Sequence, residues 1–284
     1  MKIRPALRSL LRIDAKKRTI DYYQALSEMF ELLTHGSAMY NLGLWAGGER
    51  EPHEAQRALV DKVIEGLPTR GHWLDVGCGP GGPAWYLAVK YPELSITGVD
   101  LDVGKVQRAL ALSTEAPGRL HFLVGDADCL PFTAEKFDAL ISIEAAYHFR
   151  DRQQFTHQAY RVLKPGAPIA LTDIVWRGNL RSPADLVRRA AAQKALGAAE
   201  LPNPEVWRAH LERYGFEQLE LIDISDAVFA GFHHWAENLR RMSTALTAPD
   251  SVIAAAAAGL DRIYAERASS PLGYVLVRAR KAAG

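Results

Sequence analysis

The sequence predicts an α/β fold, a doubly wound and mostly parallel sheet of seven strands with helices on both faces. Two observations carry this prediction. From residue 72 onward short apolar runs alternate with helical segments, and a glycine-rich turn follows the first of these runs directly. Strands that alternate with helices form parallel sheets covered on both sides. The expected strands are 72–77, 95–100, 119–124, 137–143, 167–175, 216–224 and 272–279.

The composition of the 284 residues is that of an ordinary soluble globular protein, with 48% hydrophobic and 24% charged residues. Because the net charge is only +1, we expect no nucleic-acid partner, which would need a concentrated basic surface. No apolar run reaches the ~18 residues of a membrane span. The N-terminus lacks the apolar core of a signal peptide, and two isolated cysteines form no disulfide framework. These features predict a cytoplasmic protein.

Three helical regions lie outside the regular alternation of strands and helices. The first contains residues 20–35, whose apolar side chains recur at helical spacing before glycines and aromatic residues break the pattern. The other two interrupt the last third of the chain, and each is long enough for two helices. The expected organisation is an N-terminal helical lid at 1–55, a core at 56–176, and the rest of the sheet at 177–284 with helical cap insertions at 177–215 and 226–270.

The turn "LDVGCGPGG" (74–82) places four glycines between a buried strand and a helix. Such a turn presents backbone N–H groups and a helix N-terminus to an anionic or polar ligand. Its spacing also matches the dinucleotide fingerprint G-x-G-x-x-G, and Asp100 ends the next strand, where a ribose-binding carboxylate belongs. By itself the turn therefore predicts an adenosine-containing cofactor and leaves a nicotinamide-dependent oxidoreductase open.

Three later motifs separate these alternatives. "GDADCLPF" (125–132) follows the third expected strand, "FDALISIEAAYHF" (137–149) contains the fourth, and "LKPGAPIALTD" (163–173) leads into the fifth. In this order, over about residues 70–176, they resemble the class I S-adenosylmethionine-dependent methyltransferases, in the branch that contains natural-product O-methyltransferases. The resemblance implies a Rossmann-like fold and S-adenosyl-L-methionine as the cofactor.

The resemblance also implies which residues hold the cofactor. Asp75 and the glycine loop would hold its amino-acid end, and Asp100 would accept hydrogen bonds from both ribose hydroxyls. Leu101 would lie against the adenine face, Asp126 would accept from the adenine amino group, and backbone near the fourth strand's end would touch the ammonium group. The complete implied set is Asp75, Gly77, Gly79, Gly81, Asp100, Leu101, Asp126, Ala127, Ile143 and Glu144.

A candidate catalytic pair follows the fourth and fifth expected strands. His148 comes just after the fourth strand and Asp173 ends the fifth, so both are expected at the carboxyl edge of the sheet. A histidine whose far nitrogen meets a carboxylate is an oriented base. This pair resembles the arrangement in O-methyltransferases that act on sugars and polyketides. We therefore expect His148 to be the general base and Asp173 its orienting partner, with a purely wall-forming His148 as the alternative.

The expected activity is methyl transfer to a small-molecule acceptor, at the hydroxyl or enol oxygen of a polyketide-like or other secondary metabolite, by a monomer or homodimer. Trp45, Tyr147 and Trp176 are expected to form walls of the acceptor pocket. C-methylation is an alternative, although Lys105 stands where C-methylating relatives tend to carry Gln. An NAD-dependent oxidoreductase and a cofactor-binding protein without methyl transfer also stay open. No acidic cluster follows Asp173, so no metal is expected.

Overall fold

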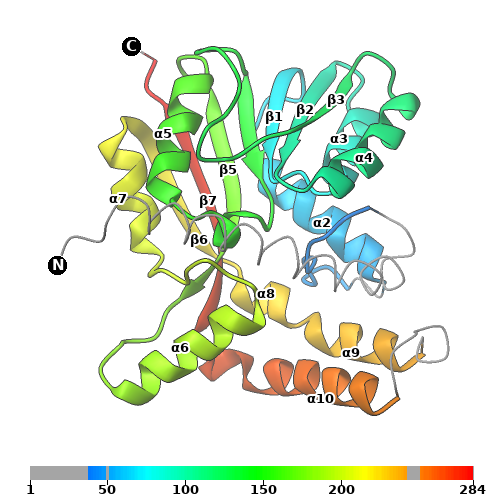
Figure 1. The fold of residues 1–284 in the computed structure, drawn as a ribbon, viewed down its shortest axis with the longest axis vertical. Coiled ribbons are helices and arrows are strands. Elements are labelled where there is room, and N and C mark those ends of the chain that lie inside the picture. Colours follow the sequence, from blue (N-terminus) through cyan, green and yellow to red (C-terminus); the bar gives the residue numbers. More distant parts are fainter. Residues whose placement is uncertain (1–37, 49–50, 242–249, 284) are drawn as a thin grey trace.

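The computed structural model describes residues 38–48, 51–241 and 250–283. Its centre is one seven-stranded sheet in the order β3-β2-β1-β4-β5-β7-β6, in which only β7 runs antiparallel to its neighbours (Figure 1). The predicted Rossmann-like, doubly wound fold and all seven predicted strands are confirmed. The strands are β1 (Gly71–Val76), β2 (Leu94–Asp100), β3 (Leu120–Val124), β4 (Ala139–Ser142), β5 (Pro168–Trp176), β6 (Phe216–Asp223) and β7 (Leu272–Lys281).

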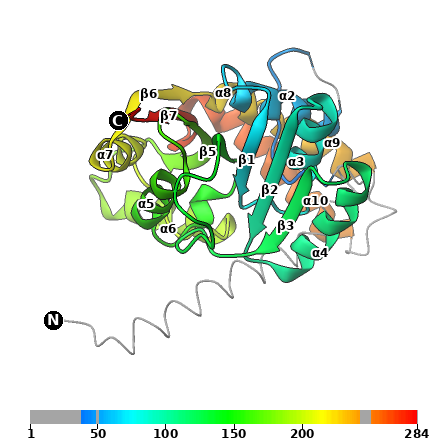
Figure 2. The ribbon, with the colours of Figure 1, turned by 90° about the horizontal axis from the view of Figure 1, so that it is seen from above.

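Helices cover both faces of this sheet. Helices α2, α3 and α4 lie on one face and α5 and α7 on the other (Figure 2). Their apolar side chains belong to the two hydrophobic clusters that cover these faces. Because both faces are covered, every residue of β5 is buried. The described helices are α2 (Pro52–Ile64), α3 (Gly82–Lys90), α4 (Val103–Leu112), α5 (Arg152–Val162), α6 (Pro183–Ala195), α7 (Glu205–Arg213), α8 (Ser225–Phe229), α9 (Phe232–Arg241) and α10 (Asp250–Glu266).

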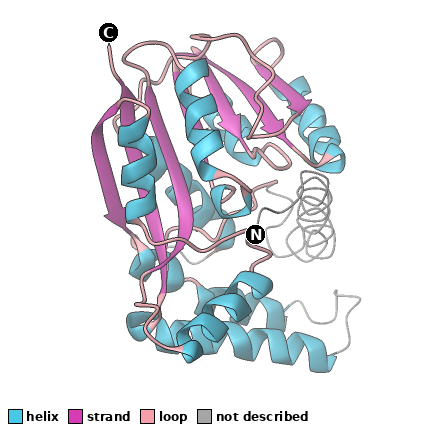
Figure 3. Ribbon diagram, turned by 60° about the vertical axis from the view of Figure 1, so that its left-hand side comes forward, coloured by secondary structure: helices cyan, strands magenta, loops and turns pink. Residues whose placement is uncertain are grey.

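The two predicted insertions supply the helices outside these layers. The one after β5 forms α6 and α7, and α6 begins with a capping box between Ser182 and Asp185, with Pro183 in its first turn. The one after β6 forms α8, α9 and α10, of which α9 and α10 lie side by side. Figure 3 shows helices gathered beyond one end of the sheet, whereas α7 packs on the sheet itself.

Only part of the predicted N-terminal lid can be placed. Residues 1–37 and 49–50 lie outside the described residues, and with them the predicted helix at 20–35. The described segment 38–48 is fixed by backbone hydrogen bonds from Leu44 N to Ala55 O (2.8 Å) and from Trp45 N to Ala227 O (2.9 Å). It is therefore attached both to α2 and to the insertion after β6.

Candidate functional site

A cavity of about 900 Å³ lies at the carboxyl ends of β1, β2 and β4. Ligand pockets span roughly 300–1,000 Å³, so this one is large enough for a cofactor together with a second small molecule. The segment 38–48, the start of α4 and the end of α6 complete its lining. Nine of the ten predicted cofactor residues line it, namely Asp75, Gly77, Gly79, Asp100, Leu101, Asp126, Ala127, Ile143 and Glu144.

Glycine occupies Gly77, Gly79 and Gly81 of the β1–α3 turn for different physical reasons. A Cβ on Gly77 would lie 2.2 Å from the Cβ of Ala145, so glycine lets this turn touch the turn after β4. A Cβ on Gly79 would meet nothing within 4 Å. Gly81 is outside the cavity lining, and a Cβ there would lie 2.9 Å from the ring of Phe122. The predicted cofactor contact of Gly81 is thus corrected to a packing role at the left-handed N-cap of α3.

Buried carboxylates make the cavity suitable for a ligand that carries hydrogen-bond donors. Asp75 is 1% exposed, and its Oδ2 has no hydrogen-bond partner among the described residues. Burial, with the nearby charge of Asp100, raises the pKa of Asp75 to about 7. A buried polar atom without a partner is rare in a folded protein and is expected where a ligand completes the site.

Asp100 and Asp126 are held in place by the backbone around them. The Oδ2 of Asp100 accepts from Gly79 N and its Oδ1 accepts from Asp102 N, each at 2.9 Å. The Oδ1 of Asp126 accepts from Asp128 N at 3.1 Å. A carboxylate oxygen has two lone pairs, so Asp100 can keep these bonds and still accept from a ligand diol.

His148 also lines the cavity, and its ring orientation is set by the loop after α6. Its Nδ1 lies 2.9 Å from the carbonyl oxygen of Gly197. Because a carbonyl can only accept, Nδ1 carries the proton and Nε2 is the acceptor nitrogen of the neutral ring. Burial lowers the pKa of His148 to about 3, and the charges of Lys105 and Arg152 act in the same direction. His148 is therefore neutral throughout the physiological pH range.

The predicted pairing of His148 with Asp173 is wrong. Asp173 is fully buried, and its Oδ2 accepts from Arg152 Nε and Trp207 Nε1, each at 2.9 Å. Successive side chains of a strand point to opposite faces, and Asp173 points to the face covered by α5 and α7. It is absent from the cavity lining. Asp173 joins both helices to the sheet, through a buried ion pair with α5 and a hydrogen bond from α7.

None of the three predicted pocket walls lines the cavity. Trp45 stacks on His234 of α9, with ring centroids 4.7 Å apart. Tyr147 and Trp176 are 7% and 4% exposed and belong to the hydrophobic core. The prediction is corrected because these aromatic rings fill space between elements of the fold rather than facing the cavity.

The structure adds residues that the sequence analysis did not select. Tyr40 and Asn41 line the cavity from the N-terminal segment, and the Asn41 Nδ2 has no partner within the described part of the chain. Lys105 lines it from α4 and lies over the ring of Tyr40, 5.7 Å from the centroid. Gln193 and Lys194 approach from α6. The sequence gives little indication of these residues, because they lie on three separate segments that only the fold brings together.

Two further properties concern the described residues alone. They contain no helix whose length and apolar character would allow it to cross a bilayer. They also contain no group of three His, Cys, Asp or Glu side chains placed to hold a metal ion.

Comparisons with known proteins agree with this geometry. A family model described as a methyltransferase domain matches residues 74–171. The 27-O-demethylrifamycin SV methyltransferase of Amycolatopsis mediterranei is 30% identical over 266 residues, which cover 91% of this chain and 95% of that protein. The erythromycin 3''-O-methyltransferase of Saccharopolyspora erythraea is 31% identical over 241 residues, 81% of this chain and 78% of that protein. The crystal structure of the (4+2)-cyclase SpnF shares the fold, with a TM-score of 0.76 at 24% identity, over 93% of this chain and 95% of that one.

Proposed function

The chain belongs to the class I S-adenosylmethionine-dependent methyltransferases that act on small molecules, and on that premise we propose that it methylates an oxygen atom of a polyketide-like or other secondary metabolite. The cofactor of this family is S-adenosylmethionine. When bound, it supplies an electrophilic methyl group on a positively charged sulfur, which transfers to the acceptor as the sulfur becomes neutral. The residues of this chain must then bind the cofactor, orient the acceptor and remove the proton of its hydroxyl group.

The cavity offers a matching partner for each part of the cofactor. We assign the unpartnered Oδ2 of Asp75 to the ammonium group and the carboxylate of Asp100 to the ribose hydroxyls. Leu101 and Asp126 also line the cavity, and we assign them to the adenine. Gly79 fits this assignment, since the space its missing side chain leaves is part of the cavity.

His148 is the proposed general base. The hydrogen bond to Gly197 places the ring proton on Nδ1, so Nε2 is the acceptor nitrogen and the atom that we assign to the proton of an acceptor hydroxyl. A pKa of about 3 makes this nitrogen a weak base. A hydroxyl oxygen becomes much more acidic as it gains a methyl group, so a weak base suffices if the proton moves late in the step. This fixed acceptor nitrogen in the cavity is the observation that carries the proposal.

Oxygen is favoured over carbon by the two relatives reported above, whose names describe O-methylation, and by the neutral, oriented imidazole. We also propose that segment 38–48 and the end of α6 cover the bound acceptor, since both line the cavity. The prediction of a cytoplasmic monomer or homodimer stays a prediction.

The test is to incubate the purified protein with cofactor labelled at the methyl carbon and a panel of hydroxylated polyketides. Nuclear magnetic resonance of the product distinguishes a labelled O-methyl group from a labelled C-methyl group. We expect an O-methyl product, and a labelled C-methyl group would move the assignment to carbon. If the protein binds S-adenosylhomocysteine in calorimetry yet methylates no member of the panel or of a bacterial metabolite extract, it is a cofactor-binding protein without methyl transfer.

A further inference from the structure

Glu144 is one of the buried titratable groups in the lining of the cavity. It follows β4 directly, and its Oε1 accepts from Leu42 N at 2.6 Å and from the Tyr274 hydroxyl at 2.8 Å. The Glu144 backbone N donates to Thr172 Oγ1 at 2.9 Å. Strands β5 and β7 and the N-terminal segment thus all contact Glu144, and the latter two contact its carboxyl group.

The backbone of Glu144 is in an unfavourable conformation. Its φ of 52° is in the left-handed region, which non-glycine residues with long side chains seldom adopt. Strain of this kind persists only where surrounding contacts fix the residue, and it is concentrated at functional sites. Here the turn is also pressed against the glycine loop, because Ala145 occupies the space that a Gly77 side chain would need.

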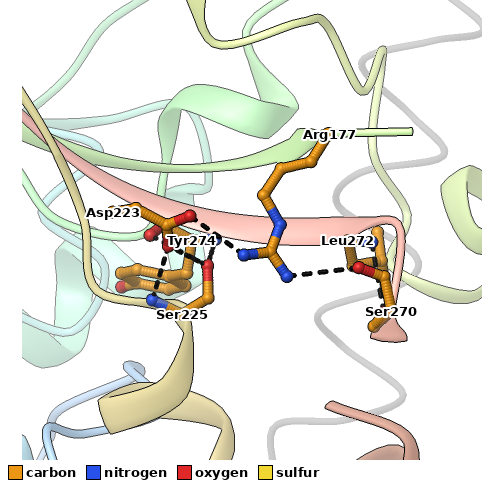
Figure 4. A network of polar contacts seen from close by, with 6 residues as sticks. All are labelled: Arg177, Asp223, Ser225, Ser270, Leu272 and Tyr274. Carbon is orange, nitrogen blue, oxygen red and sulfur yellow. Dashed lines mark hydrogen bonds and ion pairs between the residues drawn. The ribbon is translucent and has the colours of Figure 1, made fainter. Parts of the chain in front are cut away.

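The position of Tyr274 is fixed by a network at the start of β7 (Figure 4). Its backbone N donates to Ser225 Oγ at 2.8 Å, and Ser225 N donates to Asp223 Oδ1 at 2.9 Å. Arg177 joins this group through Nη1 to Asp223 Oδ2 (2.9 Å) and Nη2 to the carbonyl of Ser270 (3.2 Å). The strand is thereby held so that the phenol of Tyr274 reaches the carboxyl group of Glu144.

From this arrangement we propose that Glu144 is a second acid–base residue of the site, which takes up the proton that methylation of a hydroxyl releases. The inference rests on the proposed O-methylation. In that reaction an O–CH₃ bond replaces the O–H bond, so one proton per turnover enters the cavity. His148 takes it at Nε2 and then loses it, and the carboxylate of Glu144 becomes a carboxylic acid.

The acid–base properties of the two groups support this order. Burial raises the pKa of Glu144 to about 7, against the opposing hydrogen bonds from Leu42 and Tyr274, whereas burial lowers that of His148 to about 3. Glu144 is therefore the stronger base of the two, and an acid–base group with a pKa near the working pH is the most effective one. The other charged or titratable groups around the site are Tyr40, Asp75, Cys78, Asp100, Asp102, Lys105, Asp126, Asp128, Arg150, Lys194 and Tyr274, with the Arg152–Asp173 pair on the opposite face of the sheet.

The decisive variant is Glu144→Gln, whose amide oxygen can still accept from Leu42 and Tyr274. With saturating cofactor we expect kcat to fall at least about 100-fold. In the parent protein kcat should change with pH around a midpoint near 7, where Glu144 titrates, and this pH dependence should disappear in the variant. The affinity for S-adenosylhomocysteine should stay within about threefold. Glu217→Gln, an exposed position on β6, is the control and should match the parent protein.

Tyr274→Phe provides a readout that a purely structural role would not move. The phenol O–H stabilises the ionised carboxylate, so its removal should shift the kcat transition to higher pH. Infrared difference spectra of the parent protein against Glu144→Gln should show one buried carboxyl group that titrates near neutral pH, and this measurement needs no acceptor.

The proposal is overturned if Glu144→Gln keeps more than about a tenth of the parent kcat, or if no such carboxyl group titrates between about pH 5.5 and 8.5. A persistent transition near pH 7 in Glu144→Gln would also overturn it. These outcomes are separate from a failure of the proposed function, in which the parent protein itself forms no O-methyl product.

Discussion

The Nδ1 atom of His148 donates a hydrogen bond to the carbonyl oxygen of Gly197, 2.9 Å away and 49 residues later in the chain. Two further contacts join the same segments, from Ala199 N to Tyr147 O (2.8 Å) and from Arg152 Nη2 to Glu200 O (3.1 Å). The loop after α6 thus lines the cavity and also determines which nitrogen of His148 is the acceptor.

Replacing His148 by alanine should lower the rate of O-methylation by roughly 10²–10⁴-fold, as for the loss of a general base. The dissociation constant of S-adenosylhomocysteine should change little, because the change affects proton transfer rather than cofactor binding. His157→Ala is the control, since His157 is exposed and stacks on Tyr214 outside the cavity. A loss below tenfold under saturating cofactor would reduce His148 to a pocket wall.

The His148 ring should contribute no kinetic transition near pH 6.5, the ordinary histidine value. Its pKa of about 3 keeps the imidazole neutral from well below pH 5 upward. The pH dependence of kcat should therefore have the same midpoint in the parent protein and in the residual activity of His148→Gln. A transition near pH 6.5 that vanishes in this variant would contradict the structure.

Cofactor affinity should rise with pH through about 7 because of Asp75. Burial raises the folded pKa of Asp75 to about 7, so below this pH the carboxyl group is protonated and cannot pair with an ammonium group. For a single group with this pKa, affinity at pH 8 should exceed that at pH 6 by roughly tenfold. Calorimetry with S-adenosylhomocysteine measures this. Asp75→Asn should bind weakly without the pH dependence, whereas Glu144→Gln should keep it.

The same raised pKa affects the stability of the protein without cofactor. Between the ordinary pKa of Asp75, 3.8, and the folded value of about 7, the folded state binds more protons than the unfolded state. The free energy of unfolding should therefore decrease as pH rises through this window, and less steeply in Asp75→Asn. Urea unfolding at several pH values measures the slope. Equal slopes for the two proteins would show that Asp75 is not protonated in the folded state.

Alanine at Gly77 should mainly affect the stability of the fold, whereas alanine at Gly79 should mainly affect cofactor binding. Gly77→Ala should destabilise the fold, because the new Cβ would overlap Ala145 at 2.2 Å. Gly79→Ala should leave the protein folded but weaken cofactor binding, since its Cβ would enter the cavity. Gly66→Ala is the control for backbone strain, with a φ of +81° and nothing within 4 Å. Thermal unfolding and calorimetry together separate the effects, and unchanged cofactor affinity in Gly79→Ala would exclude the loop from binding.

Replacing Asp173 by asparagine should reduce stability rather than chemistry. The change leaves the guanidinium of Arg152 buried without its counter-charge, and breaking a buried pair costs about 3–5 kcal/mol. Asp138→Asn, which removes a partly exposed ion pair with Lys164, should cost no more than ~1 kcal/mol. Chemical unfolding measures both. A stable Asp173→Asn protein with strongly reduced kcat would restore a catalytic role.

The sequence alone determined the sheet and the cofactor-binding edge. Seven apolar runs match the seven strands, and Gly77, Gly79, Asp100 and Asp126, which the sequence predicts as cofactor-binding residues, line one cavity. These features are local: strand and turn propensities, and ligand-facing loops that directly follow strands, are encoded within a few residues of one another.

The tertiary structure decided everything that depends on contacts between distant segments. Asp173 is at the expected strand end, but the alternation of side chains along β5 turns it to Arg152 and Trp207 on the opposite face. The partner of His148 comes from a loop 49 residues away, and the acid–base properties of Glu144 depend on Leu42 and Tyr274, which are 102 and 130 residues away. Burial and long-range hydrogen bonds set the pKa values and the side-chain directions at this site. The spacing of residues in a motif predicts neither burial nor such hydrogen bonds.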